Sequence, residues 1–385
     1  MQRRTAVPFW RDVRVLNVLS QIIFVLVVVA LFGFLFSNLT SAMRQRGLVA
    51  GFDYLRNTAG FEIGESLIPY RPTDTYGRAY VVGLLNTLLV SVVGIVLATI
   101  VGVIIGVARL STNWLVNRLA AVYIEIIRNT PLLVQLVFVY FGVFFQLPPV
   151  ADTIALPGHI FANQRGVFVP RPVLSSTFLP WLAFVAVGVV VAIVAWKLAA
   201  RVSPNAVVPA AVAVAAVLLV PALGWFFLGT PLTMELPVRE RFNFTGGLTL
   251  SPEFSAILAG LVIYTAGFIA EVVRGGIQSV TRGQIEAAQA LGLSGSQILR
   301  LITFPQAMRV IVPPLTSQYL NLAKNSSLAV YIGYPDLFAV NQTIANQTGQ
   351  PVPAIALVMV TYLTMSLLTS LIMNIYNRRV QILEK

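Results

Sequence analysis

The chain has 385 residues, of which 57% are hydrophobic and only 10% are charged, whereas about 25% of the residues in an average soluble domain are charged. This composition excludes a soluble globular protein and places the chain in a membrane. The formal net charge is +12, and the sequence has no cysteine, which excludes disulfides, iron–sulfur clusters and thiol catalysis.

Long apolar runs predict an all-α integral membrane protein with about eight transmembrane helices. The expected spans lie at about 15–36, 82–108, 119–147, 179–196, 205–228, 254–273, 307–332 and 353–376. The chain then divides into an N-terminal cytoplasmic tail with the first span and an outer loop (1–81), two core spans (82–147), an inserted region (148–252), three further core spans (253–378) and a cytoplasmic tail (379–385).

The first span could also be a signal peptide, because a basic leader precedes an apolar core of about fifteen residues. The residues that follow it, 37–43, offer only a poor small-residue cleavage site. We therefore expect a retained anchor, followed by a polar outer loop that is too short to form an independent domain.

The inserted region differs in composition from the spans around it. It has six prolines between residues 148 and 180, and then an Ala/Val-rich hairpin of two spans with almost no polar residues. A hairpin that is apolar on all sides is expected to pack against lipid and not to line a path for a substrate.

The seventh span is the least regular. It contains Pro313-Pro314 and then the polar run Lys324-Asn-Ser-Ser327. This pattern predicts a broken helix, which is tolerated at membrane depth only where it faces protein or a watery cavity.

Basic residues indicate the orientation of the spans. With the N-terminus in the cytoplasm, 16 of the 26 Lys and Arg residues fall on the inner side and nine on the outer side, where nine acids balance them. An excess of positive charge on the inner side is typical of membrane proteins. It explains the net positive charge of the chain without a nucleic-acid partner. Both termini, and the loop between the sixth and seventh spans, are therefore expected in the cytoplasm.

That loop is soluble, helix-prone and about twenty residues long. Residues 286–291 are good helix formers, and Gly292 stands where a helix commonly ends in the left-handed conformation. Ser294 precedes Gln297 by three residues, which is the spacing of a capping box, and Pro305 is expected to stop the second helix. The sequence thus predicts a helix–turn–helix on the membrane surface.

The loop resembles the cytoplasmic "EAA" loop of ABC importer permeases, in which Glu-Ala-Ala is followed at fixed offsets by Gly, Ile and Pro. Six residues match at the expected spacing: Glu286, Ala287, Ala288, Gly292, Ile302 and Pro305. Phe304 replaces the usual Leu and keeps an apolar side chain. In that family the loop docks on a separate ATPase subunit, so the resemblance implies that residues 281–306 are the ATPase-coupling loop.

Other segments are similar to the polar amino-acid permeases of the same family, the histidine/glutamate/glutamine type. They are residues 83–88, 128–142, 271–280 and 324–329. The resemblance covers about 82–147 and 254–378 and implies a five-helix permease core. The extra first span and the inserted hairpin resemble the enlarged permeases of general L-amino-acid importers in Gram-negative bacteria.

The resemblance implies a multi-pass transport subunit of the bacterial inner membrane. Its expected partners are a cytoplasmic ABC ATPase dimer, a second permease that is identical or homologous, and a periplasmic amino-acid-binding protein. The sequence contains no Gly-Lys pair and therefore no phosphate-binding loop of the usual kind. ATP is expected on the partner, and no cofactor on this chain.

Two acid–base pairs are candidates for an inner gate. Glu125 precedes Arg128, and Glu271 precedes Arg274, by three residues near the cytoplasmic ends of two spans. Residues at this spacing share a helix face and can pair. They either form networks that rearrange during transport, or they reach the interface and pair incidentally.

The candidate substrate path is the polar run of the seventh span together with one glutamine. Lys324, Asn325, Ser326 and Ser327 offer donors for a carboxylate, or partners for neighbouring helices. Gln135 is a single polar residue in an apolar span, for which packing is the favoured explanation.

Two other functions are alternatives to an ATP-driven importer. An ion-coupled secondary amino-acid transporter would need intramembrane carboxylates, and the expected spans carry no central Asp or Glu. A non-transporting scaffold would need neither the coupling loop nor the broken span. No carboxylate pair, Ser/His arrangement or metal cluster is apparent in the sequence, so we do not expect an enzyme.

Overall fold

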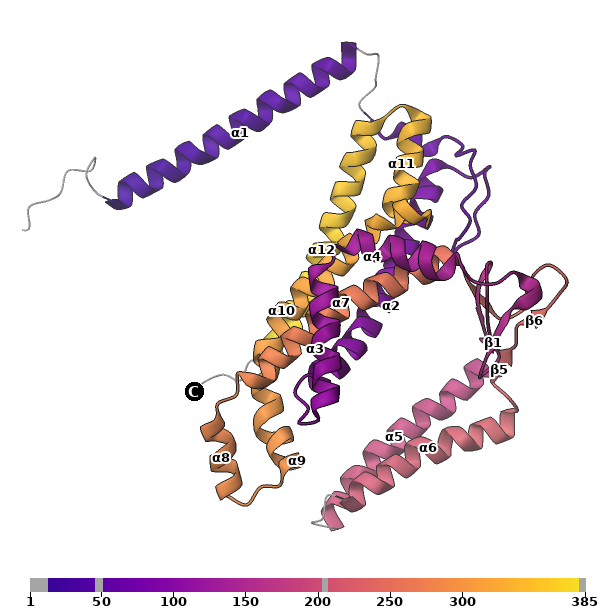
Figure 1. Ribbon diagram of the computed structural model, residues 1–385, viewed down its shortest axis with the longest axis vertical. Helices are drawn as coiled ribbons and strands as arrows, with labels where there is room; N and C mark the ends of the chain where they lie inside the picture. The colour runs from indigo at the N-terminus through magenta and orange to yellow at the C-terminus, as the bar shows by residue number, and fades with distance from the viewer. Residues whose placement is uncertain (1–12, 46–50, 203–206, 381–385) are drawn as a thin grey trace, which may run out of the picture. The chain divides into compact units, whose positions relative to one another are not determined.

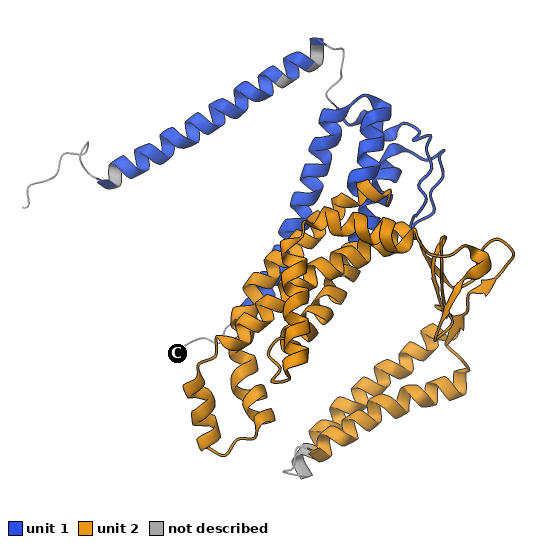
Figure 2. Cartoon of the chain, viewed as in Figure 1, with its two compact units in different colours: residues 1–89, 335–378 blue, residues 90–334, 379–385 orange. Residues whose placement is uncertain are grey.

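The computed structural model describes residues 13–45, 51–202 and 207–380 (Figure 1). These residues belong to two compact units: residues 1–89 with 335–378, and residues 90–334 with 379–385 (Figure 2). The expected N-terminal tail, and residues 381–385 of the expected C-terminal tail, lie outside the described residues.

Seven helical segments in the described ranges are long and apolar enough to cross a bilayer, and a bent helix pair provides an eighth. The seven are α1 (Val13–Gln45), α2 (Tyr76–Ala108), α5 (Phe178–Val202), α6 (Val207–Leu228), α7 (Pro252–Gln278), the segment Gly295–Ile332 that includes α10 (Phe304–Asn325), and α12 (Pro351–Val380). The prediction of a helical membrane protein with about eight spans is confirmed.

The third expected span is not one continuous helix. It consists of α3 (Trp114–Asn129), α4 (Leu132–Val139) and the π-helix η2 (Tyr140–Phe144), with a bend of 107° between α3 and α4. The bend lies at Thr130-Pro131, where both residues have extended ψ angles of 129° and 138°. A residue before proline is disfavoured in the helical region, so the helix ends there.

The inserted region contains short β-strands that the sequence did not predict. One antiparallel sheet has the order β1 (Ile154–Leu156), β2 (Ile160–Asn163), β3 (Gly166–Val169) and β8 (Leu248–Leu250). Two-stranded ribbons pair β4 (Arg171–Leu174) with β5 (Leu232–Glu235), and β6 (Val238–Arg239) with β7 (Phe244–Thr245). The 3-10 helix η3 (Val150–Asp152) precedes them.

These strands bring the two ends of the insertion together. Strand β3 pairs with β8, so that Val167 lies opposite Leu250, two residues before α7 begins. The ribbon β4–β5 closes the base of the hairpin formed by α5 and α6. The strands are only two to four residues long, too short for a period-2 pattern to reveal them in the sequence.

The expected break at Pro313-Pro314 is wrong. Helix α10 continues through both prolines and ends at Asn325, after which the 3-10 helix η5 (Ser326–Ile332) begins. Val312 and Leu315, on either side of the prolines, are buried within the helical bundle. Pro313 and Pro314 themselves are exposed, so the buried residues beside them hold this part of α10 in a regular helix, as membrane proteins commonly allow. The irregularity falls at the polar run instead.

Residues 51–89 and 335–378 form a unit with its own core. The 3-10 helix η1 (Asp53–Arg56) and the helix α11 (Leu337–Thr348) pack together with the first turns of α2. Buried residues of this core include Tyr54, Tyr80 and Ile344. Asn86 fixes the loop before α11, because its amide donates hydrogen bonds to the carbonyls of Glu65 and Pro335, both at 2.9 Å.

Asp336 begins α11 and has an unusual environment. Its side chain is fully buried, accepts a hydrogen bond of 2.8 Å from the Ala339 N–H, and receives another from the Tyr362 hydroxyl. Burial raises the pKa of Asp336 from its ordinary value of 3.8 to about 6, although the hydrogen bonds oppose the rise. Between these values the folded chain holds a proton that the unfolded chain has released, so stability falls as pH rises.

We expect Asp336→Asn to remove this loss of stability at higher pH. Asparagine keeps the N-cap acceptor and carries no charge. The free energy of unfolding of the variant, relative to that of the wild type, should therefore rise by about 3 kcal/mol between pH 4 and pH 7. Melting temperatures in detergent at pH 5 and pH 7 provide the measurement, with the exposed Asp53→Asn as control. An identical response to pH in wild type and Asp336→Asn would contradict the prediction.

Candidate functional site

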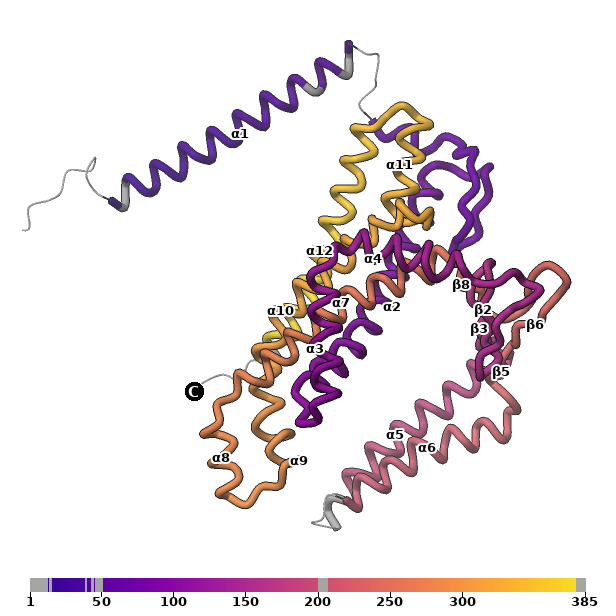
Figure 3. Tube along the Cα trace, in the orientation of Figure 1, coloured from indigo at the N-terminus to yellow at the C-terminus, as the bar shows by residue number. Residues whose placement is uncertain are grey.

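The loop between α7 and α10 forms two short helices, α8 (Arg282–Ala290) and α9 (Gly295–Ile298). Figure 3 traces the chain from α7 through both helices into α10. Gly292 has φ of 76°, and its N–H donates to the Gln289 carbonyl at 2.9 Å. The Leu293 N–H donates to Ala288 at 3.2 Å, which completes a Schellman motif. The predicted helix–turn–helix is present.

The second helix begins as the sequence predicts. Ser294 and Gln297 form a capping box, in which the Ser294 N–H donates to Gln297 Oε1 at 2.8 Å. The two residues thereby satisfy donors that the first turn of a helix leaves free.

The expected stop at Pro305 is wrong. The π-helix η4 (Leu299–Thr303) joins α9 to α10, and the Phe304 N–H donates to the Leu299 carbonyl five residues earlier. A proline inside a helix lacks an N–H and crowds the carbonyl four residues before it. The wider π-turn gives that carbonyl room, so the helix continues through Pro305 into the span.

The six motif residues divide into two groups in the structure. Ala288 is buried, and Ile302 and Pro305 are half-buried, so they belong with Gly292 to the frame of the loop. Glu286 and Ala287 are exposed.

The sequence analysis missed Leu291, which is 82% exposed at the turn. A large apolar residue directly before a C-capping glycine is the signal that would have found it. It gives the loop an apolar tip that could enter a groove on another protein.

Of the two predicted acid–base pairs, one forms. Arg274 donates to both carboxylate oxygens of Glu271, with Nε at 2.9 Å from Oε2. The ion pairs of the described residues do not include Glu125 with Arg128. The Arg128 guanidinium instead lies 5.4 Å from the centre of the Phe268 ring, and it is close enough to Glu271 to interact electrostatically.

Arg109 at the end of α2 adds a third positive charge near Glu271. A single carboxylate therefore faces guanidinium groups from three segments of one unit: Arg109, Arg128 from α3 and Arg274 from α7 itself. The candidate inner gate therefore centres on Glu271. Glu125 is exposed and is not part of this cluster.

The polar run of the seventh span serves mainly the end of α10. The hydroxyls of Ser326 and Ser327 each donate to a carbonyl three residues earlier, at 2.8 Å. Lys324 is exposed in the last turn, where a positive charge is favourable to the helix dipole. Asn325 is half-buried at the start of η5, and its side chain makes no capping hydrogen bond there. These hydrogen bonds lie within the run's own helical segment, so they identify neither a partner on a neighbouring helix nor a substrate, and the substrate path stays a prediction.

Gln135 holds the bend between α3 and α4. Its amide nitrogen donates to the carbonyls of Ile127 at 2.8 Å and Thr130 at 2.9 Å, which the bend frees from helical hydrogen bonds. The side chain is buried. The amide nitrogen of Gln135 therefore stabilises the broken span, whereas its Oε1 is buried without a hydrogen-bond partner among the described residues, and its place in the substrate path stays a prediction.

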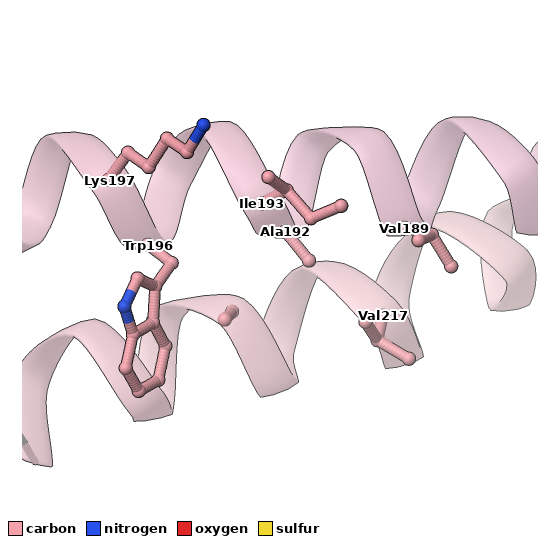
Figure 4. Close-up of a pocket in the computed structure, with 7 residues that line it drawn as sticks. Val189, Ala192, Ile193, Trp196, Lys197 and Val217 are labelled. Carbon is pink, nitrogen blue, oxygen red and sulfur yellow. The ribbon is translucent and has the colours of Figure 1, made fainter. Parts of the chain in front are cut away.

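The described part of the larger unit includes an apolar groove and a second, mixed hollow. Figure 4 shows the groove between α5 and α6, which is lined by Val189, Ala192, Ile193, Trp196, Lys197, Ala213 and Val217. The surface of this groove is apolar, as expected for a hairpin that faces lipid. The second hollow has a mixed polar and apolar lining and includes Tyr140 and Glu253, whose hydroxyl and carboxylate are joined by a hydrogen bond of 2.9 Å. The sequence analysis missed this pair.

Comparison with known proteins gives consistent results. Residues 206–382 match the family described as "Binding-protein-dependent transport system inner membrane component". The chain is 42% identical to the general L-amino acid transport system permease protein AapQ of Rhizobium johnstonii, over 97% of this chain and 94% of the relative. It is 44% identical to the putative amino-acid ABC transporter permease protein YhdX of Escherichia coli K12, over 95% and 94%.

A third relative is the glutamate/glutamine/aspartate/asparagine transport system permease protein BztB of Rhodobacter capsulatus. It is 37% identical over 97% of this chain and 96% of its own length. Similarity therefore extends through the first span and the insertion as well as the core. The ion-coupled transporter considered as an alternative gains no support from these relatives.

Proposed function

This chain belongs to the family of inner-membrane permease components of binding-protein-dependent ABC transport systems, and on that premise we propose that it carries polar or general L-amino acids across the bacterial inner membrane. The observation that carries this proposal is the similarity to named amino-acid permeases along nearly the whole chain. The seven or eight apolar helices support it, since a path across a bilayer needs several packed spans.

We further propose that ATP is hydrolysed by a separate cytoplasmic ATPase that binds the α8–α9 loop. The sequence has no phosphate-binding loop of the usual kind, so the energy must come through a partner. The loop offers that partner a compact pair of helices with an exposed apolar tip at Leu291. Glu286 and Ala287 lie exposed on α8, where they can contact the same partner.

The remaining partners follow from the same premise. A second permease, identical or homologous, would complete the path, and a periplasmic binding protein would deliver the amino acid. The distribution of basic residues supports an orientation with both termini and the loop in the cytoplasm. Within this orientation, Glu271, Arg274 and Arg128 are proposed to form an inner-side network that rearranges during transport.

The proposal is tested by reconstituting the chain with its ATPase and co-permease in proteoliposomes, with the binding protein on the outer side. Uptake of labelled amino acids should require ATP and the binding protein together. Uptake driven by an ion gradient without ATP would support the secondary transporter instead.

A substitution at Gly292 tests the role of the loop. Gly292→Val should reduce ATPase co-purification and ATP-driven uptake at least tenfold, because a β-branched residue is strained at φ of 76°. Gly295→Ala provides the matched control, since Gly295 has open space around it and no positive φ. Unchanged co-purification with Gly292→Val would remove the loop from the coupling interface.

A further inference from the structure

A cavity of about 310 Å³ with a mixed polar and apolar lining is found where α7 begins. It is lined by Tyr140, Phe145, Gln164, Pro252 and Glu253. Tyr140 and Phe145 come from the end of the bent span, Pro252 and Glu253 from the first turn of α7, and Gln164 from the turn between β2 and β3. The insertion and the permease core therefore build this cavity together.

The cavity contains one carboxylate whose charge is not neutralised by a neighbour. Glu253 Oε1 accepts a hydrogen bond of 2.9 Å from the Tyr140 hydroxyl. In the described part of the chain, neither a lysine nor an arginine forms an ion pair with Glu253, and its Oε2 accepts no hydrogen bond. The carboxylate thus has an acceptor oxygen free for a ligand.

Two aromatic residues line the cavity together with this carboxylate. The ring centres of Tyr140 and Phe145 are 6.5 Å apart and tilted by 49°, and Phe145 is 61% exposed. The π-turn η2 sets this pair, because the Phe145 N–H donates to the Tyr140 carbonyl five residues earlier. Aromatic faces attract cations, and a carboxylate strengthens that preference.

We propose that this cavity binds the ammonium group of an amino acid on the outer side of the membrane, before the molecule enters the transport path. Glu253 accepts hydrogen bonds from the ammonium, and the rings of Tyr140 and Phe145 cover it. The size suits a small ligand, since such sites begin at about 300 Å³. This inference rests on the proposed function, because it takes the amino acid to be the transported molecule.

The lack of cysteine in the sequence permits a local test. In the assembled complex in nanodiscs, a Gln164→Cys chain carries a single thiol at the rim of the cavity. An amino acid that the wild type transports should slow maleimide labelling of this thiol at least threefold. Its N-acetylated form, which has no ammonium, should not. Arg165→Cys, next in the chain and outside the lining, should show no protection.

Substitutions in the lining complete the test. Adding Glu253→Gln to Gln164→Cys should abolish protection and raise the half-saturating amino-acid concentration for uptake five- to twentyfold. Glu240→Gln, an exposed outer acid outside the cavity, should change neither. Phe145→Leu should weaken protection, because it removes an aromatic face from the cavity. Because Phe145 is largely exposed, this variant remains informative if Glu253→Gln fails to fold.

The outcomes separate this inference from the proposed function. Protection by the N-acetylated form, or full protection with Glu253→Gln, would overturn the ammonium site while ATP-driven uptake still stands. Absence of amino-acid uptake by the wild-type complex would overturn the proposed function itself.

Discussion

A Gly276→Leu chain is expected to lose most of its folded form, whereas a Gly275→Leu chain should keep it. A Cβ atom at Gly276 would lie 2.2 Å from Cγ1 of Ile311 and 3.3 Å from the Ala307 carbonyl oxygen, both in α10. At Gly275 the same atom would meet nothing within 4 Å. The two glycines are neighbours in α7, so composition, depth and helix are matched.

The expected changes in the free energy of unfolding have opposite signs in the two variants. Overpacking a tight contact costs about 1–3 kcal/mol and sometimes more, and a leucine at position 276 must also displace the backbone of α10. Replacing an open helical glycine with leucine gains up to about 1 kcal/mol from helix propensity. Monodisperse yield on size-exclusion chromatography and the melting temperature in detergent measure both effects. Equal behaviour of the two variants would mean that α7 and α10 do not approach this closely.

Leu291→Asp is expected to abolish binding of the ATPase while leaving the permease folded. Leu291 is 82% exposed, so its replacement costs the free chain little. In a complex that buries it, the change removes about 1.5–3 kcal/mol of apolar burial and introduces an unpaired charge, which costs more. The loss of affinity should therefore exceed a hundredfold.

The measurement is co-purification of the ATPase, together with ATP hydrolysis stimulated by the binding protein. Ser296→Asp is the matched control, since it adds the same charge to an exposed site in the first turn of α9, where an acid is favourable. If both variants retain the ATPase, then the apolar tip of the loop is not part of the interface.

The conformation of the α8–α9 loop was predictable because all its signals are local. The helix formers before Gly292, the glycine itself and the capping box of Ser294 and Gln297 lie within about twelve residues of one another, and each determines the backbone beside it. Pro305 was misjudged for a reason that is also local. Proline removes the backbone hydrogen bond of one residue. The π-turn at 299–303 accommodates this loss without ending the helix.

The cavity at the start of α7 could not be predicted because its members are far apart in the sequence. Tyr140 and Glu253 are separated by 113 residues, and the insertion lies between them. Their contact depends on the pairing of β3 with β8, which returns the chain to α7. Likewise, Gln135 looked like an isolated polar residue, since only the 107° bend reveals the two carbonyls that it satisfies.

The continuity of the helix after the loop has a mechanical consequence. From Gly295 to Asn325 the chain runs through α9, η4 and α10 without a loop between them. At 1.5 Å per residue this is a rod about 45 Å long. A displacement or tilt at the turn near Leu291 would therefore also displace Lys324 and the 3-10 segment beyond it. If the helix had ended at Pro305, the chain would have been able to bend there instead.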